Sequence, residues 1–210
     1  MKKKLMTALA LVLVIAMSVA GTYAYLTSTK TVTNTFTVGS VGITLDEGKT
    51  NVDGQYVEQD GETVTDKDGA PRVYENTYKL MPGHEYAKDP TVHVVANSEN
   101  SWVFVKVVNG ISAFEAAGDT TIAKQIETND WNQLKDSNNN VIAGVYYKEY
   151  AKSGTVTNYP VFSSFKIANK ADEVNGWSNV GANNDVVITA YAIQKDGFND
   201  AYTAWGEVSK

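Results

Sequence analysis

The sequence predicts an all-β protein, an antiparallel jelly-roll-like β-sandwich with one or two short helices. Three observations lead to this prediction: about eight short runs of alternating apolar and polar residues, turn residues such as Asp-Gly and Pro-Gly between them, and little sequence with helical spacing. The 210 residues include no cysteine, so packing and hydrogen bonds between strands have to hold the fold together without disulfides.

The chain begins with the layout of a secretory signal peptide. Three lysines follow the first residue, and an apolar run then continues to Ala20. This run is shorter than the ~20 residues that a membrane-spanning helix needs. Thr22 and Ala24 stand two residues apart, as small residues do before a cleavage site. We therefore expect an exported protein whose residues 1–24 are removed by cleavage between Ala24 and Tyr25, with cleavage after Ala20 as the alternative.

A regular strand is predicted directly behind this leader, at residues 25–38. Every odd position from Thr27 to Thr37 is threonine. Alternation of β-branched and aromatic residues with polar ones has a high strand propensity. We expect a kink at Gly39-Ser40 and a continuing strand at residues 41–45. The even positions form the more apolar face of the first strand, and they include Val32, Asn34, Phe36 and Val38.

The mature chain, residues 25–210, is expected to form a single domain. Residues 46–76 are polar and carry three Asp-Gly pairs, which favour hairpin turns, so we expect an exposed hairpin insertion there. Residues 102–108 are apolar on both faces, which is typical of a central strand. Further strands are predicted at residues 91–95, 141–150, 161–169 and 185–194.

Two segments have helical character. Residues 112–130 are rich in Ala, Glu and Lys and form the best helix region. Residues 198–208 are expected to form a short helix at the end of the chain, which Asn199 or Asp200 can cap. The apolar stripe of this second helix consists of Ala201, Ala204, Trp205 and Val208.

Composition and motifs argue against several kinds of function. Without the leader lysines, 15 basic residues remain against 24 acidic ones, and no basic cluster is present, so nucleic acid and anionic membranes are poor partners. The two histidines, His84 and His93, lie nine positions apart, whereas a zinc protease of the HExxH type needs them four apart on one helix. A calcium loop starting at Asp66 would need a glutamate where Thr77 stands, so only weak calcium binding by the insertion stays open. We expect no enzyme, no cofactor and no metal site.

Three stretches of the sequence together resemble the TasA/camelysin family of exported Gram-positive proteins. They are the lysine-rich leader that continues into GTYAYLTSTKTVTNTFTVGSVGITL, the stretch LMPGHEYAKDPTVHV, and VVITAYAIQKDGFNDAYTAWGEV near the end. Residues 46–76 and 111–180 are not diagnostic. The resemblance implies that a SipW-type signal peptidase cleaves the bond between Ala24 and Tyr25.

The resemblance also implies a secreted structural protein of the extracellular matrix or cell surface. Family members of the TasA kind are jelly-roll subunits of biofilm-matrix fibres, and their N-terminal strand completes the sheet of the neighbouring subunit. Carried over to this chain, residues 25–38 are the assembly strand, and other copies of the chain are its partners in a head-to-tail filament. Matrix polysaccharide or an accessory matrix protein are further expected partners.

Three alternatives stay open from the sequence. Residues 25–38 can instead fold back into their own sheet, which would leave a monomer. The chain can be a cell-surface polysaccharide-binding module or adhesin, since its 12 tyrosines, 6 phenylalanines and 4 tryptophans include candidates for a sugar-binding face. Other family members carry a metalloendopeptidase label, but this sequence lacks a catalytic zinc motif that would support that activity.

Overall fold

Strand β5 (Ser101–Asn109) lies at the centre of the fold because its side chains are apolar on both faces. Val103 and Val105 point into one hydrophobic core, whereas Trp102 and Phe104 point into a second core on the opposite face. The strand has β10 on one side and β7 on the other. The sequence prediction of a central strand at this place is therefore confirmed.

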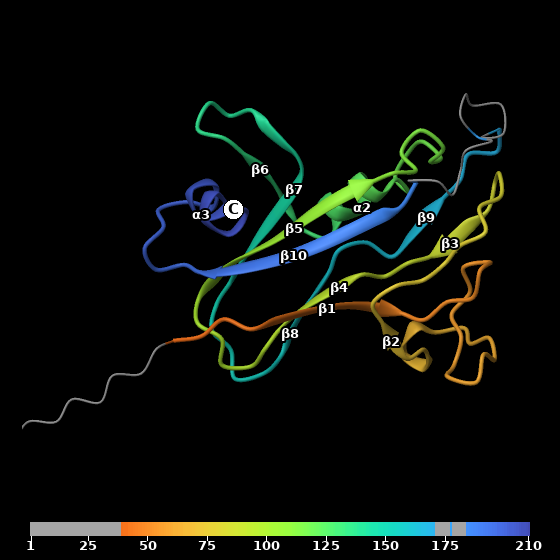
Figure 1. Ribbon diagram of the computed structural model, residues 1–210, viewed down its shortest axis with the longest axis horizontal. Helices are drawn as coiled ribbons and strands as arrows, with labels where there is room; N and C mark the ends of the chain where they lie inside the picture. Colours follow the sequence, from red (N-terminus) through yellow and green to blue (C-terminus); the bar gives the residue numbers. More distant parts are fainter. Residues whose placement is uncertain (1–38, 171–176, 178–183) are drawn as a thin grey trace, which may run out of the picture. The chain divides into compact units, whose positions relative to one another are not determined.

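The strands of this protein lie in antiparallel sheets (Figure 1), as a computed structural model shows for residues 39–170, 177 and 184–210. This confirms the all-β class with short helices. The first sheet has the order β2 (Arg72–Val73), β1 (Ile43–Gly48), β4 (Thr91–Val94) and β8 (Thr157–Pro160). The second has the order β10 (Val186–Gln194), β5, β7 (Val141–Tyr150) and β6 (Asn132–Lys135). A small third sheet pairs β3 (Glu85–Ala87) with β9 (Ser164–Lys166).

The predicted leader and assembly strand lie outside the residues that the structure describes. This applies to residues 1–24, to the bond between Ala24 and Tyr25, and to residues 25–38. The structure therefore does not describe the four residues predicted to form the apolar face of this strand, Val32, Asn34, Phe36 and Val38.

The two four-stranded sheets share one core. Ile43 and Leu45 of β1 pack against it together with Val92 and Val94 of β4, and the valines of β5 meet them from the other sheet. The second core lies on the other face of β5, under the C-terminal helix α3 (Ala201–Val208). The rings of Phe104 and Trp205 lie 5.4 Å apart there.

Helix α3 forms where the sequence predicts it. The side chain of Asp200 accepts a hydrogen bond of 2.8 Å from the backbone N–H of Thr203 and so caps the helix. Ala201, Ala204 and Trp205 are buried, as the predicted apolar stripe requires.

The other predicted helix is much shorter than the region 112–130. Only α2 (Ile122–Thr128) is helical, and Thr121 caps it. Gly118 has a φ of 113°, which a right-handed helix does not allow. Upstream of it, Glu115 forms an antiparallel bridge with Ile167. The Ala-rich composition of this region is therefore overridden by long-range pairing with the chain after β9.

The segment 46–76 contains turns at two of its three Asp-Gly pairs. Gly54 and Gly61 have φ values of 78° and 93°, which is the conformation that favours glycine. Gly69 instead ends a short 3-10 helix, η1 (Lys67–Gly69). The segment then returns to the first sheet, where Val73 of β2 pairs with Glu47 of β1. Part of it is buried in the fold: Glu47, Thr50, Val57 and Ala70.

Candidate functional site

Two strands from different sheets run side by side, β1 from the first sheet and the edge strand β10 from the second (Figure 1). In the described part of the chain, β10 has a hydrogen-bonded neighbour only on its β5 side. Strand β1 pairs with β4 on one side, and β2 pairs only with Glu47 and Gly48 on the other. We call the strip between these two strands the β1–β10 seam.

The shared core is incompletely covered along this seam. Val103 and Val105 in the neighbouring strand β5 are fully buried, at 0% exposure. By contrast, the core-facing residues of the two seam strands are only half-buried: Ile43, Leu45, Val186, Ile188, Ala190 and Ala192. A row of half-exposed apolar side chains beside a free strand edge favours the addition of another strand.

The seam widens at one end into a cavity of about 910 Å³. Leu45 lines the cavity from β1, and Ile188 lines it from β10. Ile111, Phe165 and Trp177 add apolar surface. Its polar lining includes Asn76, Glu47 and Lys88. Such a space can take a small ligand or several side chains of a bound peptide segment.

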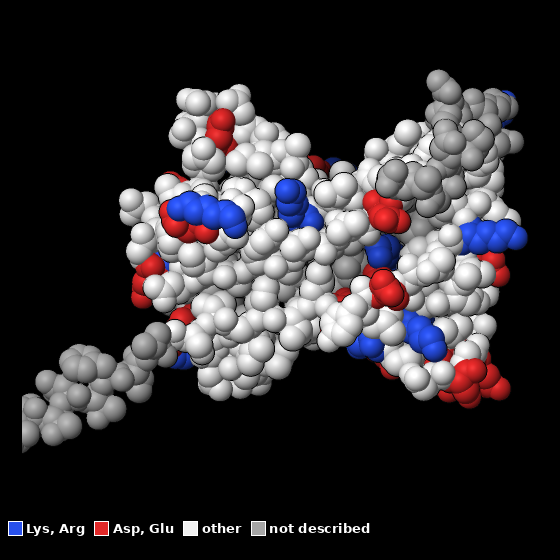
Figure 2. All heavy atoms as spheres, in the orientation of Figure 1, with Lys and Arg blue, Asp and Glu red and all other residues white. Residues whose placement is uncertain are grey.

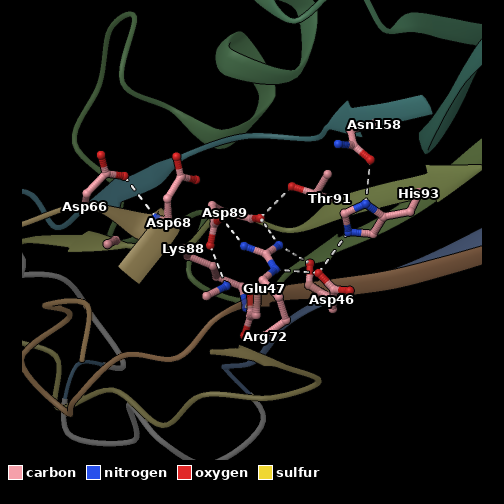
Figure 3. Close-up of polar contacts among 12 residues, drawn as sticks. Asp46, Glu47, Asp66, Asp68, Arg72, Lys88, Asp89, Thr91, His93 and Asn158 are labelled. Carbon is pink, nitrogen blue, oxygen red and sulfur yellow. Dashed lines mark hydrogen bonds and ion pairs between the residues drawn. The ribbon is translucent and has the colours of Figure 1, made fainter. Parts of the chain in front are cut away.

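A network of charged side chains fixes β1 next to this cavity (Figure 3). The guanidinium of Arg72 lies between two carboxylates, 2.6 Å from Asp46 and 2.7 Å from Asp89. The ammonium of Lys88 lies 2.6 Å from the carboxylate of Glu47, and both side chains are buried. The network therefore connects β1, β2 and the segment before β4 at the wide end of the seam.

The two histidines do not converge on one site. His93 contacts Asp46 through Nε2 at 3.0 Å and Asn158 through Nδ1 at 2.7 Å, as Figure 3 shows. The ring of His84 lies beside Tyr86, in another part of the fold. Within residues 39–170, 177 and 184–210, no group of three or more His, Cys, Asp or Glu residues is placed to hold a metal ion. Over the same residues, no helix is long and apolar enough to cross a membrane.

The carboxyl group of Asp46 makes the network sensitive to acid. Burial raises its pKa, but hydrogen bonds from Arg72 and His93 outweigh this, and the pKa lies below its ordinary value of 3.8. A lowered pKa means that the ionised group stabilises the fold above pH 3.8, and that this contribution is lost as the pH falls through the folded-state pKa.

We therefore expect Asp46→Asn to melt at a lower temperature than the wild type at neutral pH. The difference should shrink as the pH falls below 3.8 and disappear below the lowered folded-state pKa, because the wild-type carboxyl is then protonated as well. Thermal melts followed by circular dichroism between neutral and acid pH measure this, with the exposed loop variant Asp196→Asn as the matched control. A melting difference that stays constant across the whole range would contradict the assignment.

Neither the network nor the seam was found from the sequence. The network joins Asp46, Arg72, Asp89 and His93, which are far apart in the chain. The seam depends on which strands form the edges, and that order follows from long-range pairing. Comparisons with protein-family models, with curated proteins and with solved structures found no match for this chain. Any functional proposal therefore depends on the seam and on the sequence pattern of residues 1–38.

Proposed function

We propose that this protein is a secreted structural subunit of extracellular biofilm-matrix fibres, in which the N-terminal strand of one copy completes the β-structure of the next. The β1–β10 seam is the observation that supports this proposal most directly. There, the edge of β10 has no hydrogen-bonded neighbour among the described residues, and half-buried apolar side chains lie beside it. The resemblance to the TasA/camelysin family supports the same function, a SipW-type cleavage between Ala24 and Tyr25, and a jelly-roll-like sandwich.

The strand that the sequence predicts at residues 25–38 has the properties that the seam requires. It has one face of alternating threonines and one more apolar face, so it can pair through its backbone while it covers a core. Burial of Val32, Phe36 and Val38 contributes roughly 1.5–3 kcal/mol each, and each ladder hydrogen bond roughly 0.5–1.5 kcal/mol. Association itself costs roughly 4–15 kcal/mol. The sum favours assembly only when most of the strand is paired.

Contacts at Ser40 and Gly42 argue for a second copy and against fold-back. The carbonyl of Ser40 accepts a hydrogen bond of 3.0 Å from the N–H of Glu99, and the carbonyl of Gly42 accepts one of 2.9 Å from the N–H of Val95. These bonds hold the backbone before β1 along the β4–β5 turn. A hairpin needs at least two loop residues. Only Gly39 lies between the end of the predicted strand at Val38 and the fixed Ser40. A fold-back would therefore use up part of the alternating strand.

The surface supports assembly that responds to salt. Acidic and basic side chains are interspersed on the face shown in Figure 2, and most of the surface over β1 and β10 is uncharged. The mature chain nevertheless has 24 acidic against 15 basic residues, so copies repel one another at neutral pH. Salt screens this repulsion, so filament formation is expected to increase with ionic strength.

We expect mature protein beginning at Tyr25 to form filaments on concentration, whereas a truncated chain beginning at Gly39 stays monomeric and folded. The truncated chain keeps the edge of β10 but lacks residues 25–38, which would bind to the next copy. Negative-stain microscopy and light scattering across pH and salt measure assembly, and circular dichroism measures folding. A mature chain that stays monomeric throughout, with truncation merely unfolding it, would place the strand in its own sheet.

Two matched point variants separate assembly from folding in this experiment. Phe36→Ser removes a side chain of the apolar face, while Thr35→Ser changes the threonine face at the adjacent position. Loss of the burial of one large apolar side chain raises the concentration needed for assembly at least about tenfold. The Thr35 variant should assemble like the wild type. If no variant assembles, the polysaccharide-binding alternative becomes the better one, since Tyr74 is 89% exposed at the cavity.

A further inference from the structure

We infer that the β1–β10 seam is the acceptor, and that residues 32–38 of a second copy bind there antiparallel to β10, with Phe36 opposite Ile188. This inference rests on the proposed function and adds the place, the direction and the register of the bound strand. The direction follows from the hydrogen bonds at the two ends of the seam, and the register from its faces and its width.

The two seam strands run in opposite directions. At one end, the N–H of Lys195 after β10 donates to the carbonyl of Asn100, and the N–H of Glu99 donates to the carbonyl of Ser40 before β1. The end of β10 and the start of β1 therefore meet at the β4–β5 turn. At the other end, Glu47 of β1 and Val186 of β10 both line the cavity. We call these the turn end and the cavity end of the seam.

The donor strand leaves its own subunit at the turn end, because it directly precedes Gly39, which lies against Glu99. If it entered the next subunit also at the turn end, two identical ends would meet, and the two copies could exchange strands and close into a dimer. A filament needs two different ends in contact. The donor strand therefore enters at the cavity end, and its residues run in the direction of β1 and antiparallel to β10.

Antiparallel pairing of the donor strand with β10 also fits the edge of β10 that is unpaired in the described part of the chain. The strand β10 offers nine residues, Val186–Gln194, and its other edge is fully paired with β5. Residues that lie opposite each other in an antiparallel pair share one face of the sheet. The even-numbered residues of β10 face the shared core, so the even-numbered donor residues with Phe36 and Val38 face it too.

The width of the seam sets the register. The cavity lies beside Ile188, where the largest donor side chain, Phe36, finds room. Farther along β10 the core-facing residues are small, Ala190 and Ala192, and they come opposite Asn34 and Val32. On the outer face, the same register places Thr37 of the donor opposite Val187, which is 48% exposed.

Cross-linking between two single-cysteine variants tests this arrangement, and the chain contains no cysteine that would interfere. Mature Thr37→Cys protein with a size tag is mixed with untagged Val187→Cys protein, assembled into filaments, and treated with an oxidant that takes up the two electrons and two protons of disulfide formation. A disulfide between the two variants can form only between copies. Two control mixtures replace the donor with Thr29→Cys, or the acceptor with Asn132→Cys on the opposite edge strand β6.

We expect the Thr37–Val187 mixture to give at least about fivefold more hetero-dimer than either control, because a disulfide needs Cα atoms within about 7 Å. Dominant cross-linking of Thr29 to Val187 would mean parallel binding, and dominant cross-linking to Asn132 would mean addition to β6. Either result in normal filaments overturns this inference and leaves the fibre function standing. Absence of filaments from the wild-type mature chain overturns both.

Discussion

Replacing Glu47 by alanine is expected to lower the free energy of unfolding by about 3–5 kcal/mol, the usual cost of removing one partner of a buried ion pair. The side chains of Glu47 and Lys88 are 6% and 9% exposed, and their charged atoms lie 2.6 Å apart. Glu47 also accepts a hydrogen bond of 2.9 Å from Asn76. Without the carboxylate, the buried ammonium of Lys88 loses the partner that lies 2.6 Å from it. Urea unfolding of the truncated chain that begins at Gly39 measures the loss without interference from assembly.

Two further variants test the cause of this loss. Glu127→Ala removes one partner of an exposed ion pair, in which both side chains are 51% exposed, and should change stability by no more than about 1 kcal/mol. The double variant Glu47→Leu with Lys88→Met should recover most of the loss, because an apolar pair of similar volume needs no compensating charge. A Glu47→Ala protein as stable as the Glu127→Ala protein would contradict the assignment of a buried pair.

Phe104→Ala is expected to lower the free energy of unfolding by about 3–5 kcal/mol, because it leaves a cavity in the core. Phe104 is 0% exposed and lies between the second sheet and helix α3. Its ring is 5.4 Å from that of Trp205 and 6.4 Å from that of Tyr147. Truncation leaves a cavity that neither a strand nor a short helix can close. Urea unfolding of the truncated chain again measures the change.

The structure also offers a graded control for this second prediction. Phe104→Leu keeps most of the volume and should lose much less stability than the alanine variant. Tyr202 of α3 is 38% exposed, and Tyr202→Ala should change the free energy of unfolding by about 0.5 kcal/mol or less. Equal losses for the leucine and alanine variants would show that α3 does not pack against this ring.

Strands with strong alternation could be predicted from the sequence, because their pattern is local. Residues 102–108 and 185–194 correspond closely to β5 and β10, and the predicted strand at residues 141–150 coincides with β7. The strands β3 and β8 were missed, since segments of three or four residues carry too little periodicity. The helix at 112–130 was overestimated because composition ignores the bridge from Glu115 to Ile167.

The candidate site could not be predicted in the same way. The seam exists because β1 and the edge strand β10 lie side by side, and these strands come from distant parts of the chain. Arg72 lies in a polar stretch that reads as an exposed insertion, yet it connects Asp46 with Asp89. Single charged residues in turn-rich sequence carry no local sign of such a partner. Residues 25–38, which the alternation in the sequence proposes as a donor strand, lie outside the described residues, so their role stays a prediction.

The two-sided burial of β5 has a consequence for when this protein can fold. Its neighbour β10 and the helix α3 that covers Trp102 and Phe104 are made from residues 186–208, which follow β5 far along the chain. Until β10 and α3 are in place, β5 has one unpaired edge and one uncovered apolar face. Pairing between such distant segments is slow, and partly folded chains with free apolar edges aggregate. Residues 186–208 therefore control completion of the second sheet and its core, so that the β1–β10 seam exists only after β10 has paired with β5.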